Sequence, residues 1–410
     1  MQIYVVDSIM GSGKTTAAIN MMNEDVESNY IFITPFLKEV ERIKKSCTNR
    51  KFFEPENKGK GKLDSLHFLI GQGYNIASTH ALFKMYTEDT KELIRNKNYK
   101  LILDEVFDVL EMIPLHKDDI SLMLDKGLSH LDKDNYVVWD DDSYHGKKFK
   151  EIKQMAGNHN LMLVDETLLL WNFPVDIFQS FNEAYILTYM FDAQIQKYYY
   201  DLNNVKLLFL GVEYSNGKYK FSNKRTLPSY VKTLKNKINI LDDEKLNLIG
   251  EGYTSLSSSW FERDLNRRKT PLLKTLNNNL INVFSNRYKS SSDENMWTTY
   301  KDAKSALAGK GYTKGFVAVN ARATNDYRYK TNLAYCANIF FNPYLKNYFL
   351  DRGINVLEEK YALSELIQWV WRSAIREGVP INIYLPSKRM RQLLIDWLDD
   401  ISKEMEDDAI

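Results

Sequence analysis

Short apolar runs, each followed by a polar turn and a helical pattern, recur along the first part of the chain. Residues 3–6, 30–33 and 101–103 are such runs, rich in Ile, Val, Leu and aromatic residues. Continuous apolar runs of this length are typical of parallel strands that are buried on both faces. Because these strands alternate with helical patterns, the first part of the chain is expected to be an α/β domain with a parallel sheet.

The second half of the chain repeats the alternation of strands and helices. Apolar residues between Leu272 and Phe284 have helical spacing, and strand-like runs follow at residues 296–300, 316–319 and 381–385. This order predicts a second domain of the same class. We expect domain boundaries at 1–192, with an acidic insertion at about 114–144, and at 226–410. Residues 193–225 are expected to connect the two domains.

Composition excludes several classes of protein. The 410 residues are 44% hydrophobic and 27% charged, and no window reaches the roughly 18 consecutive apolar residues that a membrane span needs. Asp7 interrupts the first apolar run, so no secretory signal is expected. Cys47 and Cys336 alone can form neither a disulfide framework nor a zinc site. The expected location is the cytoplasm, with no membrane partner, and the expected state is a monomer.

Charge limits the possible partners less strictly. The chain has 55 Lys and Arg residues and 54 Asp and Glu residues, for a net charge of +1. This balance argues against a uniformly basic coat for nucleic acid, but it allows a basic groove on a balanced body.

The most informative stretch is QIYVVDSIMGSGKTT at residues 2–16. A buried strand, glycines, Lys-Thr and a helical pattern follow one another in the order that a phosphate-binding loop requires. The glycines let backbone amides turn toward phosphate oxygens, the lysine can reach the β- and γ-phosphates, and Thr15 can bind Mg²⁺. Ser8 replaces the first glycine of the full pattern. The expected cofactors are ATP and Mg²⁺, with the nucleotide bound by Gly11, Ser12, Gly13, Lys14, Thr15 and Thr16.

Two later strands end in Asp-Glu, and either pair could complete this site. Asp104 would bind the metal and Glu105 would orient and deprotonate the attacking water. Asp165 and Glu166 have the same local pattern. We favour the first pair, because its spacing leaves room for two strand–helix units after the loop. For the second pair, we expect acids that face solvent where a strand ends.

An ordered series of motifs resembles superfamily 2 helicases, the group that includes the DEAD-box and DExH proteins. In order, the segments are GSGKTT at 11–16, ITPF at 33–36, STHALF at 78–83, LDEV at 103–106, LTYMFDAQ at 187–194 and QWVWRSAIR at 368–376. The compact form resembles phage-encoded or small bacterial members. Two departures are clear: motif II continues with Val106 and Phe107, and Trp371 stands where motif VI usually has glycine.

The resemblance implies two tandem RecA-like parallel-sheet domains with a nucleotide cleft between them. It also implies an ATP-dependent helicase or translocase that acts on nucleic acid, with single-stranded or branched DNA favoured over RNA. Gln368, Arg372 and Arg376 recur every four residues, so they are expected on one face of a helix, with one arginine as a catalytic finger. Which arginine acts is left open. The expected nucleic-acid contacts are Thr34, Pro35, Thr79, His80, Thr298, Thr324 and Asn325.

Three other functions use a phosphate loop. A DNA-packaging ATPase would need a nuclease-like acidic cluster in the C-terminal half, where Asp326, Asp351 and Glu358 are weak evidence. A nucleotide switch would bind ATP without stimulation by nucleic acid. A nucleoside or nucleotide kinase would not need two sheet domains or the Gln-Arg-Arg segment.

Overall fold

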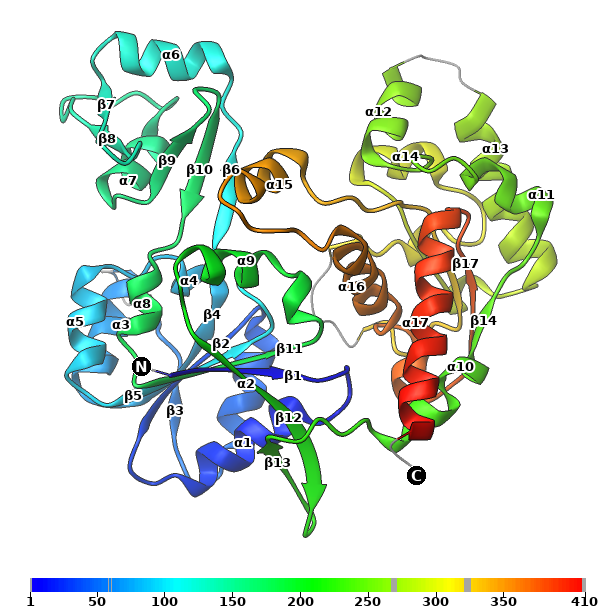
Figure 1. Cartoon of the computed structure of the whole chain (residues 1–410), viewed down its shortest axis with the longest axis horizontal. Helices are drawn as coiled ribbons and strands as arrows, with labels where there is room; N and C mark the ends of the chain where they lie inside the picture. The colour runs from blue at the N-terminus through cyan, green and yellow to red at the C-terminus, as the bar shows by residue number, and fades with distance from the viewer. Residues whose placement is uncertain (1, 58, 60, 267–270, 321–325, 408–410) are drawn as a thin grey trace. The chain divides into compact units, whose positions relative to one another are not determined.

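The computed structural model describes every residue except 1, 58, 60, 267–270, 321–325 and 408–410. Contacts divide the chain into two units, whose elements are labelled in Figure 1. The first unit comprises Met1–Ser8, Gly13–Arg225 and Tyr344–Val356; the second comprises Ile9–Ser12, Thr226–Pro343 and Leu357–Ile410. Among the described residues, no helix has both the length and the apolar character needed to cross a bilayer.

The first unit is built on an eight-stranded sheet with the order β13-β12-β1-β11-β5-β2-β4-β3. All neighbouring pairs are parallel except β12 and β13. The strands are β1 (Gln2–Asp7), β2 (Asn29–Thr34), β3 (Phe52–Phe53), β4 (Asn75–Thr79), β5 (Tyr99–Asp104), β11 (Glu183–Thr188), β12 (Leu207–Ser215) and β13 (Lys218–Ser222).

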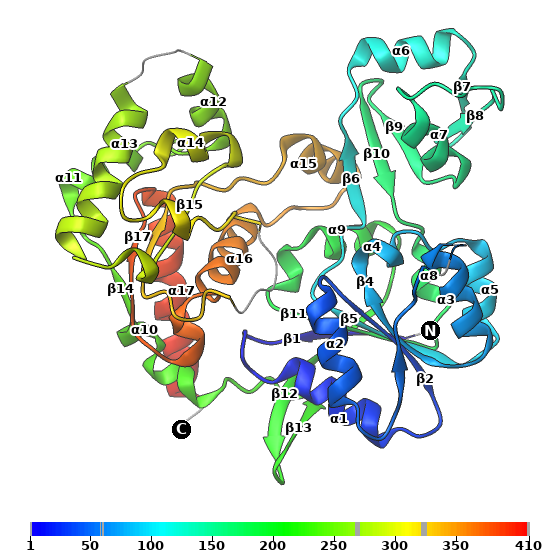
Figure 2. The same cartoon turned by 180° about the vertical axis from the view of Figure 1, so that it is seen from behind.

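Helices pack against this sheet on both faces. On one face, Ala18 and Met22 of α1 and Val40 of α2 pack with Phe32 of β2 in a buried cluster, and Figure 2 shows both helices on this face. The other face meets an aromatic cluster that includes Phe83. The helices of this unit are α1 (Lys14–Glu24), α2 (Leu37–Ser46), α3 (Lys62–Gly71), α4 (His80–Phe83), α5 (Glu88–Arg95), α8 (Val175–Gln179), α9 (Ile195–Leu202) and α15 (Pro343–Leu350).

Residues 193–225, which the sequence suggested as a connection, instead complete the first sheet. β12 pairs in parallel with β1, from Ile3 opposite Leu207 to Val6 opposite Leu210. It then turns back as an antiparallel hairpin with β13. The apolar run LLFLG is therefore a sheet strand next to the strand that leads into the glycine-rich loop.

The acidic insertion is longer than predicted and has its own core. It leaves and rejoins the sheet domain where the Phe173 N–H donates to the Val109 carbonyl at 2.9 Å. A buried cluster inside it includes Ile120, Val137, Phe149 and Leu161. Its elements are β6 (Leu110–Ile113), α6 (Lys117–Asp125), β7 (Ser129–Leu131), β8 (Val137–Trp139), α7 (Lys150–Gly157), β9 (Leu161–Val164) and β10 (Leu168–Asn172).

The second unit contains a four-stranded parallel sheet with the order β14-β17-β16-β15. The strands are β14 (Ile238–Ile240), β15 (Asn295–Thr298), β16 (Asn332–Tyr335) and β17 (Ile381–Tyr384). The helices are α10 (Leu234–Lys237), α11 (Glu244–Asn247), α12 (Ser258–Asn266), α13 (Pro271–Asn282), α14 (Lys304–Leu307), α16 (Glu358–Val370) and α17 (Lys388–Asp407). The predicted class, α/β with two tandem parallel-sheet units, is confirmed.

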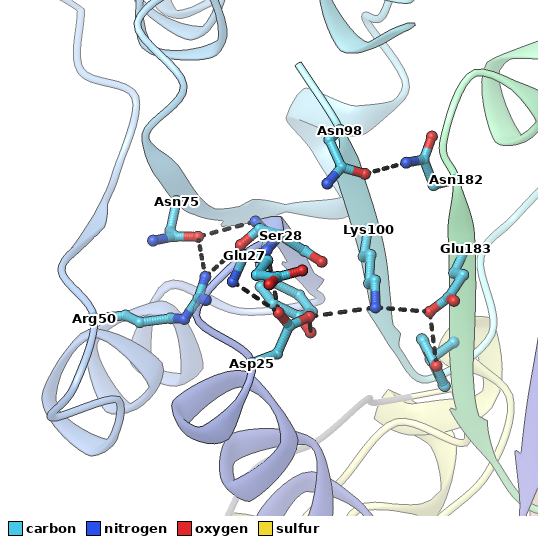
Figure 3. A network of polar contacts seen from close by, with 11 residues as sticks. Asp25, Glu27, Ser28, Arg50, Asn75, Asn98, Lys100, Asn182 and Glu183 are labelled. Carbon is cyan, nitrogen blue, oxygen red and sulfur yellow. Dashed lines mark hydrogen bonds and ion pairs between the residues drawn. The ribbon is translucent and has the colours of Figure 1, made fainter.

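A polar network fastens the amino ends of the strands in the first sheet, at the edge opposite the glycine-rich loop (Figure 3). Lys100 of β5 bridges Asp25 at 3.2 Å and Glu183 at 3.1 Å. Burial alone would raise the pKa of Asp25, but hydrogen bonds from Tyr30 and Ser28 hold that pKa well below its usual range. The network stabilises the sheet at the amino ends of its strands. Ligands of open α/β sheets bind at the opposite, carboxyl ends.

Candidate functional site

The loop between β1 and α1 has the backbone that a phosphate cradle needs. Gly11 has φ 79° and Gly13 has φ 91°, both in the left-handed region. Helix α1 begins directly after Gly13, and no side chain caps its first turn. The backbone N–H groups at the start of the helix, together with the helix dipole, therefore favour an anion at this point.

Gly13 is required for a second reason, which is the close approach of a tyrosine. A Cβ atom at Gly13 would lie 2.4 Å from Cδ1 of Tyr219 on β13. The Asn20 side chain of α1 also donates to the Tyr219 carbonyl at 2.9 Å. The β12–β13 hairpin is thus fixed against the start of α1.

Lys14 lies among three carboxylates. Its Nζ donates to the Ser8 carbonyl at 2.5 Å, which holds it back over the loop. Burial lowers the pKa of Lys14 to about 8, and the negative charges of Asp7, Asp104 and Glu105 oppose this fall. Desolvation makes the charged form of Lys14 less stable. An anionic ligand such as a phosphate would stabilise that charged form.

The loop and motif II meet at the predicted metal site. The Thr15 hydroxyl donates to Oδ1 of Asp104 at 3.3 Å, so two oxygen ligands from distant parts of the chain lie together. Burial, with the neighbouring charge of Glu105, raises the pKa of Asp104 to about 7. A hydroxyl and a carboxylate are the kind of oxygen set that Mg²⁺ uses when substrate phosphates and water supply the rest. The residues present therefore fit a Mg²⁺–nucleotide complex.

Glu105 has a backbone conformation that is uncommon for its residue type. Its φ is 68°, and its N–H donates to the Leu187 carbonyl of β11 at 3.0 Å. A non-glycine residue with left-handed backbone is strained, and such strain gathers at functional sites. Asp165 and Glu166 also have positive φ, 49° and 55°, but they lie exposed in the turn between β9 and β10, inside the insertion, so exposure rather than backbone distinguishes the two pairs. The second Asp-Glu pair faces solvent, as expected.

Three of the predicted nucleic-acid contacts are buried in the structure. Thr34 and Thr298 have no exposed surface, and His80 is 8% exposed, with its Nε2 3.2 Å from the Asp104 carbonyl oxygen. These three side chains are buried rather than presented to a polymer. Pro35 and Thr79 are half-buried and remain predicted contacts. Two further predicted contacts, Thr324 and Asn325, lie outside the described residues.

The Gln-Arg-Arg segment is not one helix, so its expected single polar face is wrong. Helix α16 ends at Val370, and a separate 3₁₀ turn covers Ala374–Glu377. Ser373 is extended, and its side chain accepts from the Ile375 N–H, which starts the new turn. The half-buried Gln368 stays on α16, Arg372 is buried, and Arg376 is exposed.

Arg376 borders a pocket of about 260 Å³. Aromatic and apolar side chains form much of the lining, with two cations and one acid. The lining residues are Gly11, Tyr230, Leu234, Lys237, Trp371, Ile375, Arg376, Glu377 and Gly378. Gly11 belongs to the glycine-rich loop, and by its contacts Ile9–Ser12 is part of the second unit. Arg376 and Gly11 therefore line the same cavity within the second unit.

Three residues around this site were not predicted from the sequence. Asp7, noted only as a charge after an apolar run, is 5% exposed and ion-paired with Arg225 at 2.8 Å. Tyr219 lies against Gly13. A signal for Asp7 was available, because an acid at the end of a buried strand directly before a glycine-rich loop must find partners there.

Comparison with known proteins assigns the family. A SPbeta prophage-derived protein of Bacillus subtilis (strain 168), YonV, is 47% identical over 414 residues, covering 97% of this chain and 99% of the relative. The chain belongs to the YonV family. Residues 232–398 match the YonV C-terminal Rossmann-like domain, and residues 110–171 match the YonV middle domain. The middle domain of the YonV family coincides with the insertion that has its own core.

Several solved structures that resemble this YonV family member are helicases. An XPD helicase is 12% identical over 96% of this chain and 94% of its own, with a TM-score of 0.45. Xpd4 of S. tokodaii is 11% identical over 97% and 94%, with a TM-score of 0.49. The DUF1998 helicase MrfA, solved with DNA, is 10% identical over 93% and 46%, with a TM-score of 0.31. At such identities, the roles of single residues rest on the geometry of this chain.

Proposed function

We propose that this chain is an ATPase that uses Mg²⁺ and is stimulated by nucleic acid, and that it moves along or remodels DNA. The observation that carries the proposal is the meeting of the left-handed glycine loop, Lys14 and Thr15 with Asp104 at the carboxyl edge of a parallel sheet. Ligands bind at this edge in open α/β sheets. A prophage origin of the relative supports a phage setting for the protein.

Each residue has a distinct task in the proposed hydrolysis. The amides after Gly13 and the Lys14 ammonium bind the β- and γ-phosphates, which relieves the desolvated charge of the lysine. Thr15 and Asp104 would hold Mg²⁺, and the charge of the ion would support phosphoryl transfer. Glu105 orients the attacking water and accepts its proton.

We propose Arg376 as the catalytic finger. Its side chain is exposed and borders the cavity that also contains the backbone of Gly11, whereas Arg372 is buried. An arginine that stabilises charge on the transferred phosphoryl group contributes roughly 10³–10⁵ in rate. Nucleic-acid stimulation would follow if binding of the polymer fixes this arginine in place.

The test compares ATP hydrolysis with single-stranded DNA, duplex DNA, a branched DNA junction and RNA in parallel. We expect stimulation by DNA, greatest with single-stranded or branched DNA. Lys14→Ala should abolish turnover with every polymer, while the control Lys218→Ala, which removes an exposed ion pair with Glu24, should behave as wild type.

Other outcomes identify other functions. ATP binding with no stimulation by any polymer would favour a nucleotide switch and would contradict a motor. Full turnover of the Lys14→Ala variant would remove the loop from the mechanism. Stimulation by RNA alone would keep the motor but reverse the proposed preference for DNA.

A further inference from the structure

Asp7 is a buried carboxylate at the entrance to the glycine-rich loop. It is the last residue of β1, and its side chain is 5% exposed. Oδ1 accepts from the Met190 N–H at 2.8 Å, and Oδ2 accepts from the Phe191 N–H at 3.4 Å. Asp7 therefore joins the start of the loop to the turn after the neighbouring strand β11, where Met190 has a left-handed φ of 56°.

The third partner of Asp7 is Arg225, the last residue of the segment Gly13–Arg225 of the first unit. Arg225 Nη2 lies 2.8 Å from Oδ2 of Asp7, and the next residue, Thr226, begins the segment Thr226–Pro343 of the second unit. The backbone at this point is also held. A Cβ atom at Gly211 of β12 would lie 2.4 Å from the Lys224 carbonyl oxygen and 3.0 Å from Cα of Arg225. The glycine thus leaves a notch in which the chain lies directly against the sheet.

The charges around Asp7 make this contact sensitive to what the loop binds. Burial raises the pKa of Asp7, and the Arg225 guanidinium opposes that rise. Lys14 Nζ donates at 2.5 Å to the carbonyl of Ser8, the residue directly after Asp7, so the lysine charge lies close to this carboxylate. Asp7 thus interacts with two cations, Lys14 in the loop and Arg225 at the end of the segment Gly13–Arg225. A bound triphosphate would offset the positive charge of Lys14. The attraction between Asp7 and Arg225 would then supply a larger share of the stabilisation of the Asp7 carboxylate.

We propose that Asp7 is a positioning residue that transmits nucleotide binding from the loop to the chain segment entering the second unit, through its ion pair with Arg225. The inference rests on the proposed function, because it requires a nucleotide in the loop. Nucleotide binding tightens the ion pair and holds residues 223–227 more firmly in the Gly211 notch. By linkage, loss of the pair weakens nucleotide binding by the same factor.

A purely structural role for Asp7 predicts something different. If Asp7 only satisfies the N–H groups of Met190 and Phe191, its pairing with Arg225 would be independent of nucleotide. The variant Arg225→Gln distinguishes the two roles, because it removes the ion pair and keeps Asp7 with both of its backbone hydrogen bonds. The Arg225 side chain is 62% exposed, so this variant should fold.

The experiment is hydrogen exchange of the full chain, read by mass spectrometry on peptides covering residues 222–228, with and without the non-hydrolysable analogue AMP-PNP and Mg²⁺. We expect exchange in wild type to slow about threefold on binding, the size that an ion pair with one exposed partner can transmit. Arg225→Gln should bind AMP-PNP about threefold more weakly and show no slowing, and Arg225→Lys should restore most of it. The control Lys220→Gln removes the 2.9 Å ion pair with Glu213 on the same hairpin and should match wild type.

The possible failures are distinguishable. If wild type binds AMP-PNP and exchange at 222–228 does not change, or if Arg225→Gln slows as wild type does, the coupling role is wrong and the proposed function stands. If wild type binds no AMP-PNP, the proposed function and this inference both fall.

Discussion

Ionisation of Asp104 lowers the stability of the folded protein, and this effect of a single residue can be tested. Its pKa rises to about 7, first because of burial and then because of the charge of Glu105 beside it. The unfolded chain would have the ordinary pKa near 3.8. Between these values the folded state binds more protons than the unfolded state, so the stability of the folded state falls as pH rises from about 4 to about 7.

Asp104→Asn should therefore stabilise the protein more at pH 8 than at pH 5, in the absence of Mg²⁺ and nucleotide. The asparagine cannot ionise, so it avoids a loss of about 2–3 kcal/mol in the free energy of unfolding between pH 5 and pH 8, or roughly 3 °C in Tm for a chain of 410 residues. Melting curves of both proteins at both pH values measure this difference. The exposed Asp165→Asn is the control and should change neither curve. Equal effects of Asp104→Asn at the two pH values would contradict the raised pKa of this carboxyl group.

At the residue scale, the sequence predicted which residues lie together better than it predicted which residues are exposed. GSGKTT and LDEV are contiguous patterns, and the structure joins them through Thr15 and Asp104. Spacing along the chain says little about which side chains become buried in the folded structure. The buried side chains of Thr34, His80 and Thr298 are examples. The partners of Asp7 were not predicted for the same reason, because Met190 and Arg225 lie about 180 and 220 positions away along the chain.

The segment after α16 shows how a periodic pattern can continue past the end of its helix. Gln368, Arg372 and Arg376 keep a spacing of four, yet Ser373 is extended and caps a new turn. The Ala374 N–H also donates outside its own segment, to the Lys330 carbonyl at 2.9 Å. Serine competes with helical hydrogen bonds in this way, so Ser373 was the available signal.

The two arginines should consequently behave differently. Arg376→Ala should leave Tm within about 1 °C of wild type, because the side chain is exposed, and lower stimulated hydrolysis about 10³-fold. Arg372→Ala should lower Tm by several degrees, because it empties a buried site. Melting curves and ATPase assays with saturating DNA check both, with the exposed Arg263→Ala of α12 as control. Normal hydrolysis by Arg376→Ala would end its assignment as the finger.

At the scale of the whole molecule, periodicity predicted the two parallel-sheet units, because buried strands and amphipathic helices leave strong local signals. It failed where a long-range pairing decided the outcome. β12 pairs with β1 although some 200 residues separate them, which places residues 193–225 in the first sheet. The insertion was placed correctly but predicted too short, because its last elements, α7, β9 and β10, lie beyond residue 144.

The insertion should be removable without loss of the nucleotide site. Its ends meet at the hydrogen bond between Phe173 and Val109, and its apolar core is built from its own residues. Replacing residues 110–171 by a short Gly-Ser linker should leave the affinity for Mg²⁺–ATP within about threefold of wild type, because loop closure over so short a span costs little. Equilibrium binding of a fluorescent ATP analogue, with Lys14→Ala in the same deletion as the negative control, measures this. The stimulation of hydrolysis by DNA is expected to persist, because the insertion is rich in Asp residues such as Asp118, Asp119 and Asp132, and their negative charge repels phosphates. A deletion that binds ATP and is still fully stimulated would limit DNA contact to the two sheet units, whereas one that folds but binds no ATP would show that the insertion supports the loop.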